Sequence, residues 1–307
     1  MLRLFVLSLV LAAMPATSAP AERVVPQPVT RIEMRRVNLH PDDAVAIYVE
    51  DLTGTLVPKH AGQPPNLDDK YSYDVAIDSA EITISAATLT LLLNKYVFAD
   101  PKSPISKVTV AIDGRQIKQK GTLHKGGVGL PFEMDASVTA TPDGNIRIRP
   151  TKLKVAHLPA KGLLDLFGVQ TDDLISGKHM HGVRVDHEDL ILDPSQLIPA
   201  PGIRGRVTAV RMAKDQLVEV YGTGARPHRA DAGRNYIAYR GGSIHFGKLT
   251  MADADLKLID NNLRDSFDFS VDHYKDQLVA GYSKTTPSSG LEVFMPDYYK
   301  VKKATGP

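Results

Sequence analysis

The chain contains no cysteine and no tryptophan among its 307 residues. Without cysteine it forms no disulfide and carries no thiolate nucleophile, so its stability depends on a buried core, which a chain of this length can build. Without tryptophan it lacks a common residue for stacking on sugar rings, although 11 Tyr and 8 Phe remain. The formal net charge is only +2, which argues against electrostatic binding of nucleic acid.

Motifs that would carry catalysis are also missing. The chain has no G-x-S-x-G elbow around Ser283, no H-E-x-x-H, no P-loop and no G-x-G-x-x-G fingerprint. Asp268 and Asp272 are two carboxylates that glycoside hydrolysis would need, but such pairs occur at arbitrary spacing in most sequences. The sequence therefore predicts a protein that is not an enzyme, with no catalytic residue and no cofactor.

The one long apolar run lies at the N-terminus. Arg3 is followed by the apolar stretch Leu4–Met14 and then by small residues that end in Ala19-Pro20-Ala21. A run of about eleven residues is too short to span a bilayer, which takes roughly 20 residues. The pattern is typical of a signal peptide over residues 1–21, cleaved before Glu22. We therefore expect a periplasmic or secreted protein.

One helix and four alternating strands dominate the region from Ile82 to Val155. Helical spacing puts Leu89, Leu92, Leu93, Tyr96 and Val97 on one face of a helix over 85–98, with Ser85 as its N-cap. Period-two runs follow, and Asp113-Gly114, Gly126-Gly127 and 142–145 supply the turns between them. The pattern predicts an antiparallel meander, and we expect residues 72–193 to form one strongly bent sheet packed against the helix.

The remaining segments suggest two regions. Residues 22–40 are polar and contain proline, which indicates a flexible N-terminal segment, and a short strand is expected at Ala46–Val49. The apolar phase shifts by one residue at Asp78-Ser79, which indicates a β-bulge. The stretch LIPAPG, 197–202, is the best candidate for a domain boundary.

The sequence thus predicts an α+β, mostly β protein, in which a curved antiparallel sheet wraps an amphipathic helix. An α+β domain over 41–200 would include a further helix over 159–168, and a β-rich region or extension would cover 203–307. Several aromatic residues gather near the C-terminus, where they either close a core or face a ligand: Phe267, Phe269, Tyr274, Tyr282, Phe294, Tyr298 and Tyr299.

Two groups of side chains resemble metal ligands. His179 and His181 would share one side of a strand near Asp186, His187 and Glu188, a donor set suited to zinc or copper. An oxygen-rich patch suited to calcium comprises Asp253, Asp255, Asp260, Asn261, Asn262 and Asp265. Exposed strand ends and ordinary turns also produce both patterns, and the calcium spacing is not that of an EF-hand. No metal site is predicted.

Two runs carry a family resemblance: AEITISAATLTLLLNKY, and SKVTVAIDGRQIKQKGTLHKGGVGLPFEMDASVTATPDGNIRIRP. Together with GLLDLFG and the D-L-I-L strand, they resemble the LmeA-type periplasmic phospholipid-binding proteins and, more broadly, one lobe of the tubular lipid-binding superfamily. The resemblance covers about residues 72–193. It implies a curved sheet that wraps a helix and encloses acyl chains, and by position it implies that Leu89, Leu92, Leu93 and Val97 face the ligand, with Phe132 and Met134 opposite.

We therefore predict an elongated apolar cavity between the helix and the sheet, lined by the residues just named together with Tyr96, Val110 and Ala136. Lys118, Lys120 or Lys125 would neutralise a headgroup phosphate, unless they belong to an ordinary solvated face. The predicted function is binding or carriage of phospholipid or another amphiphile, with transient contact with a membrane surface. The alternative is a structural cell-envelope protein with a dry core that acts through protein–protein contacts. The sequence leaves the oligomeric state open.

Overall fold

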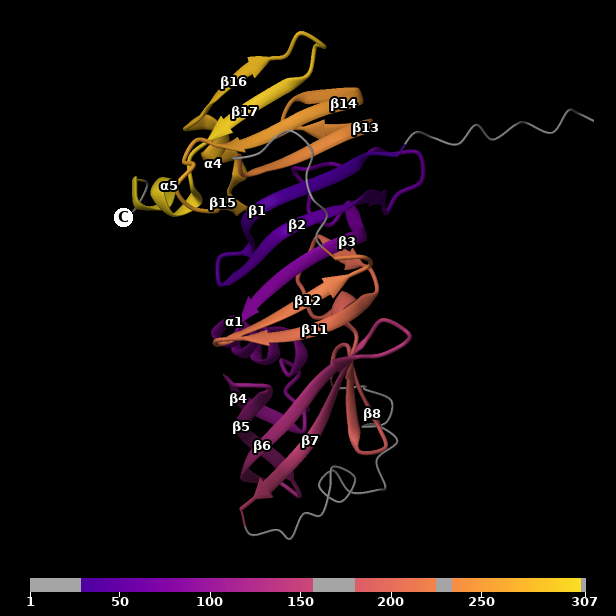
Figure 1. Cartoon of the computed structure of the whole chain (residues 1–307), viewed down its shortest axis with the longest axis vertical. Helices are drawn as coiled ribbons and strands as arrows, with labels where there is room; N and C mark the ends of the chain where they lie inside the picture. The colour runs from indigo at the N-terminus through magenta and orange to yellow at the C-terminus, as the bar shows by residue number, and fades with distance from the viewer. Residues whose placement is uncertain (1–28, 157–179, 225–233, 305–307) are drawn as a thin grey trace, which may run out of the picture.

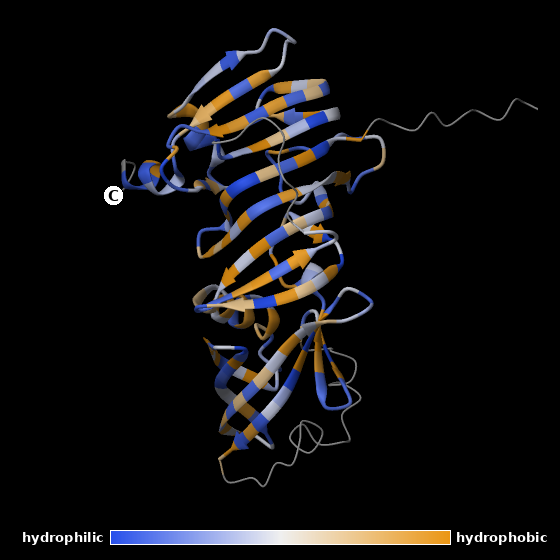
Figure 2. Ribbon diagram, in the orientation of Figure 1, coloured by the Kyte–Doolittle hydropathy of each residue, from blue (hydrophilic) through white to orange (hydrophobic). Residues whose placement is uncertain are grey.

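The computed structural model describes residues 29–156, 180–224 and 234–304. Strands account for most of these residues, and they form two sheets stacked along the long axis of the molecule (Figure 1). The predicted fold class is confirmed: the protein is mostly β, with curved antiparallel sheets and a few short helices. Apolar and polar residues alternate along strands of both sheets (Figure 2), which gives each sheet one face for a core.

The large sheet has 11 strands, and its main path runs β11-β12-β3-β2-β1-β13-β14-β17-β16. β10 pairs with β3, and β15 pairs with β1, both in parallel. The strands are β1 Arg31–Asp42, β2 Val45–Pro58, β3 Tyr73–Ser85, β10 Gly202–Arg204, β11 Val207–Ala213, β12 Gln216–Tyr221, β13 Tyr236–Phe246, β14 Leu249–Asp260, β15 Phe267–Ser270, β16 Tyr282–Thr285 and β17 Leu291–Met295. Helices α4 (Tyr274–Val279) and α5 (Tyr298–Ala304) follow β15 and β17.

The small sheet is the predicted meander. It comprises β4 Ile105–Asp113, β5 Gln116–Lys125, β6 Val128–Ala140, β7 Ile146–Val155, β8 Val183–Asp186 and β9 Asp189–Leu192, in the order β4-β5-β6-β7-β9-β8. The predicted turns are confirmed, with φ of 60° at Gly114, 60° at Gly126 and 92° at Gly144. These positive angles favour glycine, because it carries no Cβ. The short 3₁₀ turn η2 (Pro194–Gln196) leads out of this sheet.

The predicted helix forms between the two sheets. It consists of α1 (Ala86–Leu92) followed by one π-helical turn, η1 (Leu93–Val97), and the Ser85 hydroxyl accepts from the Thr88 backbone N–H as the expected cap. Asn94 accepts from the Val108 N–H at 2.9 Å and donates to the Val108 carbonyl at 2.6 Å, and Thr90 accepts from the Val110 N–H at 2.9 Å. The helix therefore satisfies backbone groups of Val108 and Val110 in β4, the edge strand of the small sheet.

The N-terminal segment differs from its prediction. From Arg31 onward, the segment predicted to be flexible is β1, which lies in the middle of the large sheet between β2 and β13. Arg36 has a left-handed φ of 48°, and beyond it β1 exchanges its partner β13 for β15. This irregularity shifts the apolar phase from Ile32 and Met34 to Val37 and Leu39, so no continuous alternation is visible in the sequence.

The division between sheets also differs from the prediction of one bent sheet over 72–193. β3 belongs to the large sheet, and only the strands from β4 to β9 form the small one. Residues on both sides of 197–202 pair within the large sheet, because β12 and β10 both lie beside β3. Local patterns predict where strands lie, but pairing across more than a hundred residues depends on the tertiary structure.

The β-rich character predicted for 203–307 is confirmed among its described residues. β11 and β12 form a hairpin, and β13 continues through Gly241-Gly242 as a single strand. The predicted bulge at Asp78 is confirmed, because the register steps from Ser79 opposite Thr53 to Ile77 opposite Gly54. The predicted signal peptide and the helix over 159–168 lie outside the described residues. Within the described ranges, no helix has the length and apolar character needed to cross a bilayer.

Candidate functional site

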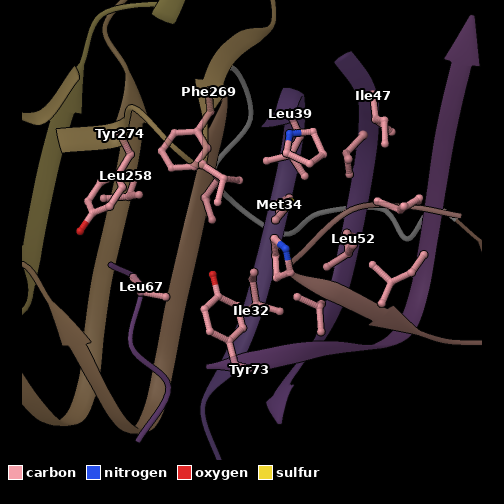
Figure 3. A pocket seen from close by; sticks show the side chains of 18 of the residues that line it. Ile32, Met34, Leu39, Ile47, Leu52, Leu67, Tyr73, Leu258, Phe269 and Tyr274 are labelled. Atoms are coloured by element: carbon pink, nitrogen blue, oxygen red, sulfur yellow. The ribbon is translucent and has the colours of Figure 1, made fainter. Parts of the chain in front are cut away.

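An apolar groove lies against one face of the large sheet (Figure 3). It contains about 840 Å³ of space not filled by protein atoms, part of which is open to solvent. Its 22 lining residues include no charged side chain, and the only polar side-chain atoms among them are three tyrosine hydroxyls. The lining comprises Ile32, Met34, Leu39, Pro41, Ile47, Val49, Leu52, Leu67, Tyr73, Val75, Ile82, Ile198, Pro199, Pro201, Ile203, Ile237, Tyr239, Phe246, Leu258, Phe269, Val271 and Tyr274.

Irregular positions in β2 and β3 direct their side chains into this groove. Ile47, Val49 and Leu52 all line it, although a regular strand would turn Leu52 to the opposite face. The register between β2 and β3 skips Glu50, so the side chain of Leu52 points to the same face of the sheet as those of Ile47 and Val49. The Asp78 bulge does the same in β3, because Val75 before it and Ile82 after it both line the groove. Bulges of this kind bend and twist a sheet, which opens space on one face.

The walls of the groove come from distant parts of the chain. Ile198, Pro199, Pro201 and Ile203 belong to the segment that was predicted to be a domain boundary. Phe269 belongs to β15, Val271 follows that strand and Tyr274 begins α4, and Figure 3 shows Phe269 beside Leu39 of β1. Of the seven aromatic residues near the C-terminus, Phe269 and Tyr274 line the groove. The segment 198–203 therefore acts as a wall of the site.

The three tyrosines of the lining differ in their partners. The Tyr274 hydroxyl donates to the Asp68 carboxylate. Tyr73 and Tyr239 are each only 5% exposed, and neither hydroxyl makes a hydrogen bond with a described residue. Burial raises the pKa of both phenols above its ordinary value, so both stay neutral and keep their protons at physiological pH. The groove therefore presents two neutral donors within an otherwise apolar wall.

The nine residues of the predicted cavity do not line this groove. Leu92, Leu93, Val97, Phe132, Met134 and Ala136 are buried in the main core, and Leu89, Tyr96 and Val110 pack against it half-buried. The Tyr96 hydroxyl donates to the Asp42 carboxylate at the end of β1, because that acceptor lies within reach of the helix. Helix and meander thus come together as expected, and these apolar side chains belong to one shared core cluster.

The predicted headgroup lysines lie on β5 of the small sheet, at the opposite end of the molecule from β13 and β14 (Figure 1). Lys118 pairs with Asp113 and Lys120 pairs with Glu133, each at 2.7 Å and in exposed positions. Lys125 is exposed at the end of the same strand. None of the three lines the groove. Alternation along β5 directs Lys118 and Lys120 to its solvent face, which agrees with the solvated-face alternative.

Part of the oxygen-rich patch that was considered for calcium comes together with a residue from farther along the chain. Carboxylate oxygens of Asp260, Asp265 and Asp297 lie within 4.8 Å of one another, whereas Asp253 and Asp255 belong to β14 away from this group. Burial raises the pKa of Asp260 to about 6, and the nearby Asp297 and Asp265 add to the effect. Lys300 supplies a cation to Asp297 at 2.8 Å. Asn262 of the loop after β14 donates to Asp297 at 3.2 Å, which joins that loop to the residue before α5.

Other residues considered for chemistry already have partners. Asp268 accepts from His40 at 2.6 Å and from Asn38 at 2.8 Å, whereas Asp272 pairs with Lys70. His187 pairs with Asp186 in the exposed turn between β8 and β9. His179 lies outside the described residues. Asp268 and Asp272 are therefore each engaged by a different basic side chain.

A buried carboxyl group lies beside the groove. Glu219 of β12 is paired in register with Ile82, a lining residue, and is 3% exposed. The Tyr221 hydroxyl donates to it at 2.9 Å. Burial raises the pKa of Glu219 to about 7, despite this hydrogen bond. The carboxyl group is therefore largely protonated below neutral pH, so it adds little charge to the groove there.

Sequence reasoning missed most of the groove because its floor lies in segments that looked flexible or polar. The available signals were short alternations interrupted by a phase shift, Ile32 and Met34 before Arg36 and Leu52 and Leu56 after Glu50. No protein-family model matches this chain, and searches of curated proteins and of solved structures found no significant match.

Proposed function

We propose that this protein is an exported, non-enzymatic binder or carrier of an amphiphile, such as a phospholipid, whose acyl chain occupies the groove. The observation that carries the proposal is the lining: 22 residues without a charged side chain around space that the protein does not fill. An acyl chain there would be removed from water at a gain of about 0.8 kcal/mol per CH₂.

Two sequence features support the same proposal. The leader over residues 1–21 has the pattern of a signal peptide, which would place the protein where envelope lipids are accessible. The resemblance to LmeA-type proteins implies acyl-chain binding by a curved sheet. Because the groove lies on the large sheet and not at helix 85–98, the proposed site differs from the one that the resemblance implies.

The test uses cis-parinaric acid, a fatty acid that fluoresces in apolar surroundings, and a groove-filling variant. Val271 lines the groove and is half-buried, so Val271→Trp can place an indole in the empty space without replacing a fully buried side chain. We expect saturable binding to the parent and at least about tenfold weaker binding to the variant, because the indole and the chain compete for one volume. Val279→Trp is the matched control, because Val279 is 86% exposed on α4 and does not line the groove.

Lipid extraction provides an independent measurement. Protein purified without detergent should release amphiphile on denaturation, as measured by mass spectrometry, and Val271→Trp should release less than Val279→Trp. If the parent carries no lipid and shows no saturable probe binding, the proposal fails and the structural envelope protein is favoured. If both tryptophan variants bind equally, the probe does not occupy this groove. Melting temperatures of the three proteins check that each is folded.

A further inference from the structure

Tyr73 and Tyr239 place two phenol hydroxyls in the wall of the groove. Both side chains are about nineteen-twentieths buried, with 5% of each exposed. Neither hydroxyl is hydrogen-bonded to a described residue, in contrast to Tyr274, whose hydroxyl is held by Asp68. Figure 3 shows the Tyr73 hydroxyl directed towards the middle of the groove. The two phenols are close enough for Tyr73 to affect the pKa of Tyr239.

An unpaired donor in apolar surroundings is costly, typically about 1–3 kcal/mol, so these hydroxyls require an acceptor when water is displaced. Alcohol, ether and carbonyl oxygens satisfy this need without charge. A phosphate or a carboxylate would carry its charge into a lining that has no cation, which disfavours it at this position. A carbonyl oxygen has two lone pairs and can accept from both phenols.

We propose that Tyr73 and Tyr239 hydrogen-bond the uncharged ester carbonyl of an acyl lipid, which places the ester inside the groove and any charged headgroup outside it. This inference rests on the proposed function, since it specifies the chemistry of the amphiphile. It makes the groove selective for acyl esters over hydrocarbons of equal length. The selectivity belongs to the two hydroxyls, whereas the affinity for the chain belongs to the apolar lining.

The experiment compares two competitors that differ in one group. Methyl palmitate and heptadecane, both delivered from methyl-β-cyclodextrin, displace cis-parinaric acid from the parent, from the double variant Tyr73→Phe/Tyr239→Phe, and from Tyr236→Phe. Tyr236 lies on the same strand as Tyr239, but its hydroxyl donates to Glu33 and it does not line the groove. The measured quantity is the ratio of the two inhibition constants, which cancels changes in probe affinity.

We expect the parent and Tyr236→Phe to prefer the ester by at least about fivefold, as one or two hydrogen bonds give. The double variant should lose this preference and retain its affinity for heptadecane. An unchanged ratio in the double variant overturns the inference, and so does a parent that binds ester and alkane equally, because water alone then satisfies the hydroxyls. If neither competitor displaces the probe, or if no probe binds at all, the proposed function fails instead. Failure of this inference and failure of the proposed function therefore give different results.

Discussion

The two sheets follow the same alternating pattern but use their apolar faces differently. The small sheet packs Phe132, Met134 and Ala136 into a core that also contains Leu92 and Val97 of the helix. The large sheet leaves a groove over β1, β2 and β3, with walls supplied by segments from the C-terminal half of the chain. One sheet therefore buries its face with the elements next to it in sequence, whereas the other needs distant segments and leaves space between them.

The sheets also differ in where their strands are interrupted and in how their edges are covered. In the large sheet, the regular pattern of β1, β2 and β3 is interrupted at Arg36, Glu50 and Asp78. One edge of β1 pairs first with β13 and then with β15, and one edge of β3 pairs with both β10 and β12. The meander also has register shifts, near Lys107 in β4 and between Asp135 and Ala136 in β6, but its edge strand β4 is held by Asn94 and Thr90 of the helix. Interruptions bend a sheet and separate its side chains, whereas a covered edge and adjacent elements permit close packing.

The largest expected effect tests whether the small-sheet core is filled. Leu92→Asp places a charge at a position that is 3% exposed, so we expect the free energy of unfolding to fall by about 4 kcal/mol. Leu91→Asp, on the same helix at 42% exposed, should cost under about 1 kcal/mol. Denaturant unfolding measures both. Equal stabilities for the two variants would mean that the helix is not buried, and the contrast between the sheets would be lost.

A second effect concerns pH and compares carboxyl groups of the two sheets. Folding raises the pKa of Glu219 from 4.5 to about 7 by burial, so the folded state favours its protonated form. The resulting contribution to the free energy of unfolding is complete below pH 4.5 and is lost as the pH rises through about 7. The total loss is roughly 3 kcal/mol. In the small sheet, hydrogen bonds from Arg149 lower the pKa of Asp189, so its contribution is lost only as the pH falls below 3.8.

Glu219→Gln isolates the first of these terms. We expect the stability of the parent relative to this variant to decrease between pH 4.5 and pH 7, as measured by denaturant unfolding at a series of pH values. Asp189→Asn is the matched carboxyl-to-amide control, and its difference from the parent should be flat over the same range. A flat difference for Glu219→Gln as well would show that Glu219 titrates normally and that the face beside the groove is wet.

The smallest effect tests how the small sheet closes its edge. Asn94→Ala leaves the Val108 N–H and carbonyl without their side-chain partner, which should cost about 2 kcal/mol. Faster hydrogen exchange at Val108 should accompany the loss, because its amide then opens to solvent. Exchange at Ile117, in the interior of the sheet on β5, serves as the internal reference. Unchanged protection at Val108 would show that the helix does not seal this edge.

The sequence by itself determined the regular part of the protein. The Ser85 cap, the Leu92 face and the glycine turns at 114, 126 and 144 are local signals, and the structure confirms them. It did not determine the groove, because Arg36, Glu50 and Asp78 break the alternation that marks a strand, and because pairing of β3 with β12 is set by contacts across more than a hundred residues. Only the tertiary structure brought Ile198, Phe269 and Tyr274 into one groove with β1 and β2, because these residues lie more than a hundred positions away from those strands in the sequence.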